Sequence, residues 1–119
     1  MPTVFVDCDD TLVLYVNQDI PNPYGILKGH PFKPNWELLD RLKSFKGQIH
    51  IWSGGGRDYA REVAVLVMPR TLRYSVGNKG FNSDTFQVGD IIVDDQPYYF
   101  EALKDRGCKV FNPFEDWVL

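Results

Sequence analysis

Short runs of β-branched and aromatic residues alternate along this chain with stretches of helical periodicity, and this alternation constrains the fold more than any other feature. The expected strands cover residues 3–6, 48–52, 71–76, 91–93 and 108–111, and the expected helices cover residues 35–46, 57–68 and 97–106. Strands that alternate with helices pair in parallel through right-handed crossovers. The sequence therefore predicts an α/β fold, a three-layer sandwich around a mainly parallel sheet of about five strands.

Two stretches do not follow the alternation. Residues 13–34 are rich in turn-forming residues, namely Pro21, Pro23, Gly25, Gly29, Pro31 and Pro34. We expect a loop there with a short hairpin, the size of a flap, and we expect an irregular connection over residues 77–90. The chain has 119 residues, 44% of them hydrophobic, which is enough for one core. Residues 1–119 are therefore predicted to form a single domain with no cap domain.

Acidic residues follow two of the expected strands at the point where each strand ends. Asp7 and Asp9 follow the first strand, and Asp94 and Asp95 follow the fourth. The carboxyl ends of parallel strands meet at one edge of the sheet, where open α/β sheets bind their ligands. Crowding carboxylates there is costly unless a cation or a shared proton relieves the repulsion. This pattern predicts a magnesium-binding, phosphate-handling site, and Asp10 is interpreted as a solvated turn residue.

The second and third expected strands bring further candidates to the same edge. Ser53, followed by Gly54 and Gly55, comes after the second strand, and Lys79 comes after the third. Bare glycine backbone makes a good anion cradle, and a lysine supplies a fixed cation for a phosphoryl group. A flexible turn at the glycines and an ordinary exposed lysine are the alternatives that the sequence leaves open.

With these residues in this order, the chain resembles a phosphatase of the haloacid dehalogenase superfamily, of a small capless type. Residues 7–12, DCDDTL, match the first motif of that family, and Ser53 matches the second. Lys79 is the candidate for the third motif, and Asp94 with Asp95 matches the adjacent-acid form of the fourth. The resemblance spans roughly residues 3–111. A two-component receiver domain carries its adjacent acidic pair early in the chain, so the order of the motifs here excludes it.

The resemblance implies a Rossmann-like fold and a magnesium-dependent phosphomonoester hydrolase that acts through an aspartyl-phosphate. Asp7 would be the nucleophile, and Asp9 would protonate the leaving oxygen and then deprotonate the attacking water. Lys79 would balance the charge of the transferred phosphoryl group. Thr11 would hold the turn after the nucleophile by hydrogen bonding and belongs with the phosphate-binding residues.

The resemblance also assigns the metal and phosphate ligands. Mg²⁺ would be held by Asp7, by the backbone carbonyl of Asp9, and by Asp94 and Asp95, with Asp95 in direct contact and Asp94 in support. Ser53 and the amides of Gly54 and Gly55 would bind the phosphoryl oxygens.

The absence of a cap bears on the substrate that the resemblance implies. Capless relatives often act on large substrates, so a nucleotide, a nucleic-acid end or another bulky phosphorylated molecule is expected, and a neighbouring subunit could supply a lid. Tyr15, Tyr24, Lys28, Phe32 and Lys33 in the flap could stack on a base or instead pack the flap onto the core. Two other functions stay open: a phosphotransferase that uses the same aspartyl-phosphate, and a catalytically silent binding module.

Charge and cysteine content add weaker constraints. The net charge is −3; setting aside five suspected site acids leaves 11 acidic against 13 basic residues, so nucleic acid is neither excluded nor indicated beyond its role as substrate. Cys8 and Cys108 have no metal or redox spacing, which predicts free thiols in a reducing cytoplasm. No apolar run is long enough to span a membrane, and His30 and His50 lack ligand partners at suitable spacing.

Overall fold

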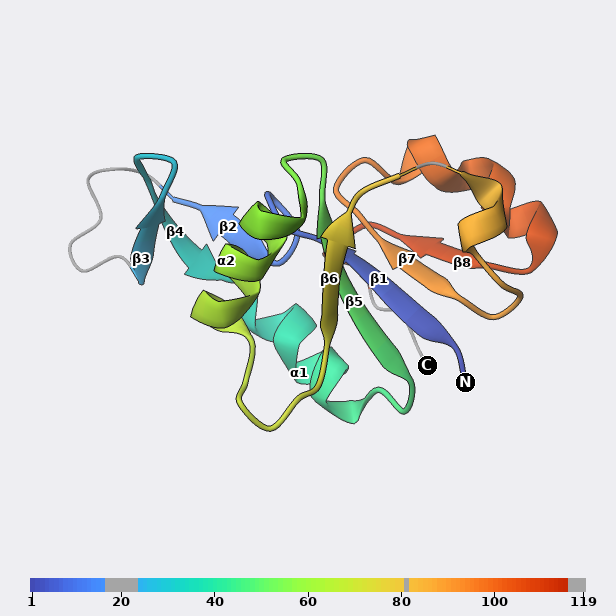
Figure 1. Ribbon diagram of the computed structural model, residues 1–119, viewed down its shortest axis with the longest axis horizontal. Coiled ribbons are helices and arrows are strands. Elements are labelled where there is room, and N and C mark those ends of the chain that lie inside the picture. Colours follow the sequence, from blue (N-terminus) through green and yellow to red (C-terminus); the bar gives the residue numbers. More distant parts are fainter. Residues whose placement is uncertain (17–23, 81, 116–119) are drawn as a thin grey trace.

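A parallel five-stranded sheet forms the centre of the structure, a computed structural model that describes residues 1–16, 24–80 and 82–115 (Figure 1). The strands lie in the order β6-β5-β1-β7-β8, and all four pairings are parallel. Their bounds are β1 (Thr3–Asp7), β5 (Gln48–Ser53), β6 (Ser75–Asn78), β7 (Ile91–Val93) and β8 (Lys109–Phe111). The predicted α/β fold is confirmed, including the number of strands.

Strand β1 alternates its side chains between two separate cores. Val4 and Val6 belong to the larger core, which α1 (Trp36–Ser44) and α2 (Arg57–Val67) cover. Phe5 points to the opposite face and packs with Phe86 and Phe100. Phe100 lies in η2 (Pro97–Arg106), so helical layers cover both faces of the sheet (Figure 1). The sheet is therefore the middle layer of the expected sandwich.

The third expected helix is present as a 3₁₀-helix, η2, rather than as an α-helix. Its buried residues, Phe100 and Leu103, are three positions apart, which is the period of a 3₁₀-helix. Pro97 lies in its first turn, and it ends at Gly107 in the left-handed region, with φ 86°, as the sequence indicates. None of the helices in the described ranges is long and apolar enough to cross a membrane.

The third expected strand begins four residues later than the sequence indicates. Residues 71–74 form no strand, and β6 pairs with β5 from Ser75 opposite His50. Leu72 and Tyr74 pack against the core without strand pairing, which explains the misleading apolar pattern. Strand β6 also continues through Gly77, where a Cβ atom would come within 2.8 Å of the His50 ring.

The described part of the flap is more regular than expected. It forms an antiparallel sheet in the order β2-β4-β3, from β2 (Val13–Tyr15), β3 (Gly25–Leu27) and β4 (His30–Pro34). Phe32 is fully buried, whereas Tyr24 stays half exposed, so packing onto the core accounts for one of these two aromatic rings. Pro21 and Pro23 lie outside the described residues. We refer below to β2, β3 and β4 as the flap sheet.

The connection between β6 and β7 is irregular, as expected. Apart from residue 81, which lies outside the described residues, it contains one short 3₁₀-helix, η1 (Ser83–Thr85). Its buried side chain Phe86 closes the second core. This segment keeps Lys79 close to the end of β6 and therefore close to the edge where the candidate site lies.

Candidate active site

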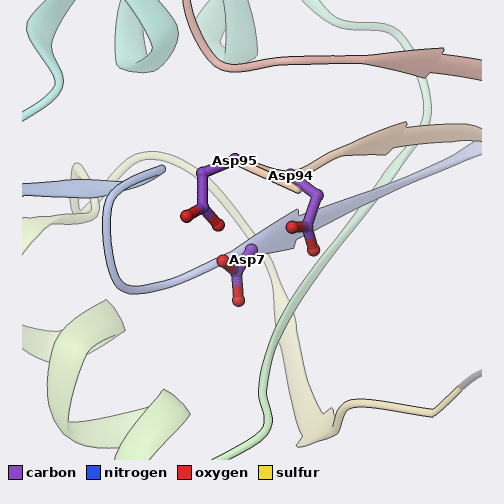
Figure 2. Close-up of side chains that lie close together, drawn as sticks. All are labelled: Asp7, Asp94 and Asp95. Carbon is purple, nitrogen blue, oxygen red and sulfur yellow. The ribbon is translucent and has the colours of Figure 1, made fainter. Parts of the chain in front are cut away.

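Three carboxylates meet at the carboxyl edge of the sheet (Figure 2). Asp7 ends β1, and Asp94 and Asp95 directly follow β7, the neighbouring strand in which Val93 pairs with Val6. One oxygen from each of the three side chains lies within 4.8 Å of the others. Asp7 and Asp94 are buried, whereas Asp95 is exposed. This oxygen-only donor set suits a hard divalent cation such as Mg²⁺.

Lys79 supplies the positive charge that offsets this cluster. Its Nζ lies 2.5 Å from Asp94 Oδ2 and 3.4 Å from Asp7 Oδ1, and its side chain is only 12% exposed. Among the described residues, no aligned hydrogen-bond donor reaches Asp94 Oδ2, so the ion pair with Lys79 offsets that buried charge. The Lys79 amide also donates to the carbonyl of Ser53 at 2.9 Å, which fixes the start of the segment after β6. The structure thus brings Lys79, the sequence candidate for the third motif, into the centre of the site.

The ionisation of the cluster reflects burial and crowding. Burial first, and then the negative charge of Asp94, raise the pKa of Asp7 to about 7, against the opposing effect of Lys79. Burial also raises the pKa of Asp95. Burial by itself would lower the pKa of Lys79, but its contacts with Asp94 and Asp7 raise it overall. The positive charge of Lys79 therefore does not fully neutralise the three carboxylates. A bound divalent cation would neutralise the remaining negative charge.

Thr11 links the two acidic loops from a fully buried position. Its hydroxyl donates to Asp7 Oδ2 at 3.4 Å and accepts from the Asp95 amide at 3.1 Å. Its own carbonyl accepts from the side-chain amide of Asn35, which also caps α1. These bonds tie Thr11 to Asp7 and to the loop after β7, and its hydroxyl is engaged by the protein.

Asp9 is held apart from the other three carboxylates by partners that the sequence analysis did not assign to it. Its Oδ1 accepts from the hydroxyls of Tyr15, at 2.8 Å, and Tyr59, at 2.5 Å, and its Oδ2 accepts from Lys28 Nζ at 2.9 Å. Burial opposes ionisation of Asp9, but the bonds from Tyr59, Lys28 and Tyr15 outweigh it and lower the pKa of Asp9. In this arrangement Asp9 is a carboxylate whose two oxygens both have donors.

The three partners of Asp9 come from three different elements. Tyr15 ends β2, Lys28 lies in the turn between β3 and β4, and Tyr59 lies in the first turn of α2. The sequence could have indicated Tyr59 as a site residue, because Tyr59 lies at the start of α2, which follows the glycine loop at the carboxyl edge of the sheet. The contacts of Lys28 depend on how the flap sheet folds back, which local sequence patterns do not reveal.

The loop after β5 is organised by Ser53. The Ser53 hydroxyl accepts from the Gly55 amide at 3.0 Å, and the Ser53 carbonyl accepts from the Gly56 amide at 3.1 Å. The Gly55 amide would have to exchange this bond in order to bind a phosphate oxygen, whereas Gly54 lies exposed at the tip of the loop. Asn78 at the end of β6 accepts from the Arg57 amide and so caps α2 from outside.

Three other polar residues, Asp10, Asp90 and His50, have structural roles or lie in turns. Asp10 is exposed and adopts φ 61°, as expected of a solvated turn residue. Asp90 is buried just before β7, where its two oxygens accept from the amides of Thr3 and Gln87. His50 bonds Ser75 through Nδ1, and burial lowers its pKa.

Both cysteines are free and buried. Cys8 Sγ donates to the carbonyl of Trp52, and burial together with Asp7 and Asp9 raises its pKa strongly. A thiol in this setting is inert. Comparison with known proteins adds no identity: no protein-family model, curated protein or solved structure matches the chain significantly.

Proposed function

We propose that this protein is a magnesium-dependent phosphomonoesterase of the haloacid dehalogenase type. The observation that carries the proposal is the grouping of Asp7, Asp94 and Asp95 at the carboxyl edge of a parallel sheet, where the Lys79 ammonium pairs with Asp7 and Asp94. The donor set is all oxygen, and within the described part of the chain the buried Asp94 Oδ2 has the Lys79 ammonium at 2.5 Å but no aligned hydrogen-bond donor, so the residues fit a hard cation. When bound, Mg²⁺ neutralises the charge between an anionic nucleophile and an anionic phosphate.

In the proposed reaction, a carboxylate oxygen of Asp7 attacks phosphorus, and the bond from phosphorus to the leaving oxygen breaks. Asp9, a carboxylate in this structure, must first take up a proton from solvent, which it then gives to that oxygen; it later removes a proton from the water that attacks the aspartyl-phosphate, so that inorganic phosphate leaves and Asp7 is regenerated. Asp9 must exchange a flap contact for the leaving oxygen, because both of its oxygens have donors in this structure. Lys79 already lies 3.4 Å from Asp7 and would stay against the transferred phosphoryl group.

The remaining metal and phosphate ligands belong to the same proposal. Asp94 is engaged by Lys79 and by the Gln96 amide at 2.8 Å, whereas Asp95 is exposed beside Asp7, which favours Asp95 for direct contact with the metal. The Asp9 carbonyl would complete the protein ligands, and Ser53 and Gly54 would meet the phosphoryl oxygens. A cytoplasmic location belongs to this proposal and is supported by two free cysteines.

The substrate is proposed to be a large molecule whose own bulk covers the site. The insertion over residues 13–34 forms only the flap sheet in its described part, so the site carries no cap domain there. Nucleotides, phosphorylated nucleic-acid ends and phosphoproteins are the candidate classes.

Phosphate release tests the proposal across such a panel. The panel holds an aryl phosphate, nucleoside monophosphates, a 3′-phosphorylated oligonucleotide and a phosphopeptide, each with Mg²⁺ and with Mg²⁺ plus excess chelator. Release that the chelator abolishes supports the enzyme, and the preferred member reports on substrate size. If folded protein releases no phosphate from any member of the panel, the catalytically silent binding module is favoured instead.

A further inference from the structure

Lys28 places an ammonium group beside Asp9 at the tip of the flap sheet. Its Nζ donates to Asp9 Oδ2 at 2.9 Å and lies 4.2 Å from the centre of the Tyr59 ring. The Lys28 side chain is 51% exposed, whereas that of Lys79 is 12% exposed, so a bound molecule can reach Lys28 from solvent. Lys28 thus lies between the candidate site and the solvent.

The backbone holds Lys28 at this position. Leu27 pairs with His30, so Lys28 and Gly29 form a two-residue hairpin turn, with φ 51° and 76°. Both values are positive, as a type I′ turn requires, and glycine or asparagine is the usual choice for such positions. A lysine in the left-handed region is sterically disfavoured, and here this conformation places the ammonium beside Asp9.

We propose that Lys28 recognises a second phosphate on the leaving-group side of the substrate. The site would then favour phosphomonoesters that carry another phosphate close to the one removed, as nucleoside bisphosphates and phosphorylated nucleic-acid ends do. This inference rests on the proposed function, because it takes Asp9 as the residue that meets the leaving oxygen.

The geometry supports this substrate class. The leaving oxygen must lie within hydrogen-bond reach of Asp9, and Lys28 Nζ is 2.9 Å from one oxygen of that carboxylate. The ammonium therefore lies within roughly 6–8 Å of the leaving oxygen, a span that neighbouring nucleotide phosphates can bridge. A phosphate is also a strong partner for lysine, which binds it as a point charge.

Exchange of partners explains why the second phosphate would matter for turnover as well as for binding. A half-exposed ion pair such as Lys28 with Asp9 contributes little to stability. A second phosphate can draw the Lys28 ammonium from Asp9 and leave Asp9 Oδ2 open to the leaving oxygen. A substrate without that phosphate must break the same ion pair without compensation.

Substrate selectivity tests the assignment. The measurement is kcat/KM for adenosine 3′-monophosphate, adenosine 5′-monophosphate and adenosine 3′,5′-bisphosphate, in wild type and in Lys28→Gln. We expect the wild type to prefer the bisphosphate about tenfold, which is about 1.4 kcal/mol, and Lys28→Gln to bring the ratio near one. Lys28→Arg should keep the preference. Lys43→Gln is the matched control, because Lys43 is 53% exposed and pairs with Asp40 away from the site.

A binding measurement separates this inference from the proposed reaction. Calorimetry with the Asp7→Asn variant, with and without Lys28→Gln, reports binding of the bisphosphate and the monophosphates in Mg²⁺ without turnover. Tighter binding of the bisphosphate that disappears with Lys28→Gln supports the assignment, even if the wild type releases no phosphate. Equal binding of the ligands, absent binding, or a preference that survives Lys28→Gln overturns it. A 3′-phosphorylated dinucleotide in the same assay distinguishes a nucleic-acid end from a free nucleotide.

Discussion

Replacing Asp7 by asparagine should stabilise the metal-free protein at neutral and alkaline pH. The pKa of Asp7 is raised in the folded state from 3.8 to about 7. The folded state therefore binds the Asp7 proton more tightly than the unfolded state does, and stability falls as the pH rises from about 4 to about 7. Above that range the shift corresponds to at most about 4 kcal/mol of destabilisation by the ionised carboxylate.

Asparagine keeps the shape of Asp7 without the charge, so Asp7→Asn should recover most of this free energy. For a chain of 119 residues, each kcal/mol moves the melting temperature by about 4 °C. In chelator at pH 8 we expect a gain of about 10 °C that falls to about 4 °C at pH 5, because the wild type has by then lost only about a third of the free energy that it loses between pH 4 and pH 7. Mg²⁺ should raise the melting temperature of the wild type more than that of Asp7→Asn, because the ion supplies the missing positive charge.

The matched control is Asp10→Asn, three residues away. Asp10 is exposed and lies at φ 61°, a conformation that asparagine adopts readily, so its melting temperature should follow the wild type at both pH values. The reasoning is refuted if Asp7→Asn is no more stable than the wild type at pH 8 in chelator. It is equally refuted if the gain is the same at pH 5.

Three further substitutions test two residues of the site, Lys79 and Thr11, and one residue outside it, Asp90. Lys79→Met leaves buried Asp94 without its ion pair and should cost roughly 3 kcal/mol at pH 8 by denaturant unfolding, with partial recovery in Mg²⁺; an unchanged midpoint would contradict the pairing. Thr11→Val removes the acceptor of the Asp95 amide and the donor to Asp7, and about 1–3 kcal/mol of unfolding free energy should be lost. Asp90→Asn disturbs one of two backbone bonds at the opposite end of β7 and should cost about 1–2 kcal/mol while phosphate release stays as in wild type; a loss of activity without unfolding would place Asp90 in the site.

The sequence was enough to predict the acidic cluster because strand ends and strand order are local and topological properties. Asp7 and Asp94 each follow a short apolar run, and β1 and β7 are neighbours in the sheet. Their meeting follows from parallel pairing alone. Lys79 was also found, although the strand before it begins later than predicted, because its backbone bond to Ser53 keeps it at the same edge.

The features that the sequence did not reveal depend on packing between distant segments. Leu72 and Tyr74 are apolar because they cover the core, and local periodicity cannot separate this from strand pairing. The 3₁₀ geometry of η2 follows from how Phe100 and Leu103 fit the second core. The surroundings of Asp9 require the flap sheet to fold back over α2, which brings together residues up to 50 positions apart.

The most direct test of the account is the rate of phosphate release from an aryl phosphate by three folded proteins: wild type, Asp7→Asn and Asp10→Asn. Each is measured with Mg²⁺ and with excess chelator. The account predicts release by wild type and Asp10→Asn that requires Mg²⁺, and no release by Asp7→Asn under either condition. Undiminished release by Asp7→Asn, or release by the wild type that persists in chelator, would contradict it.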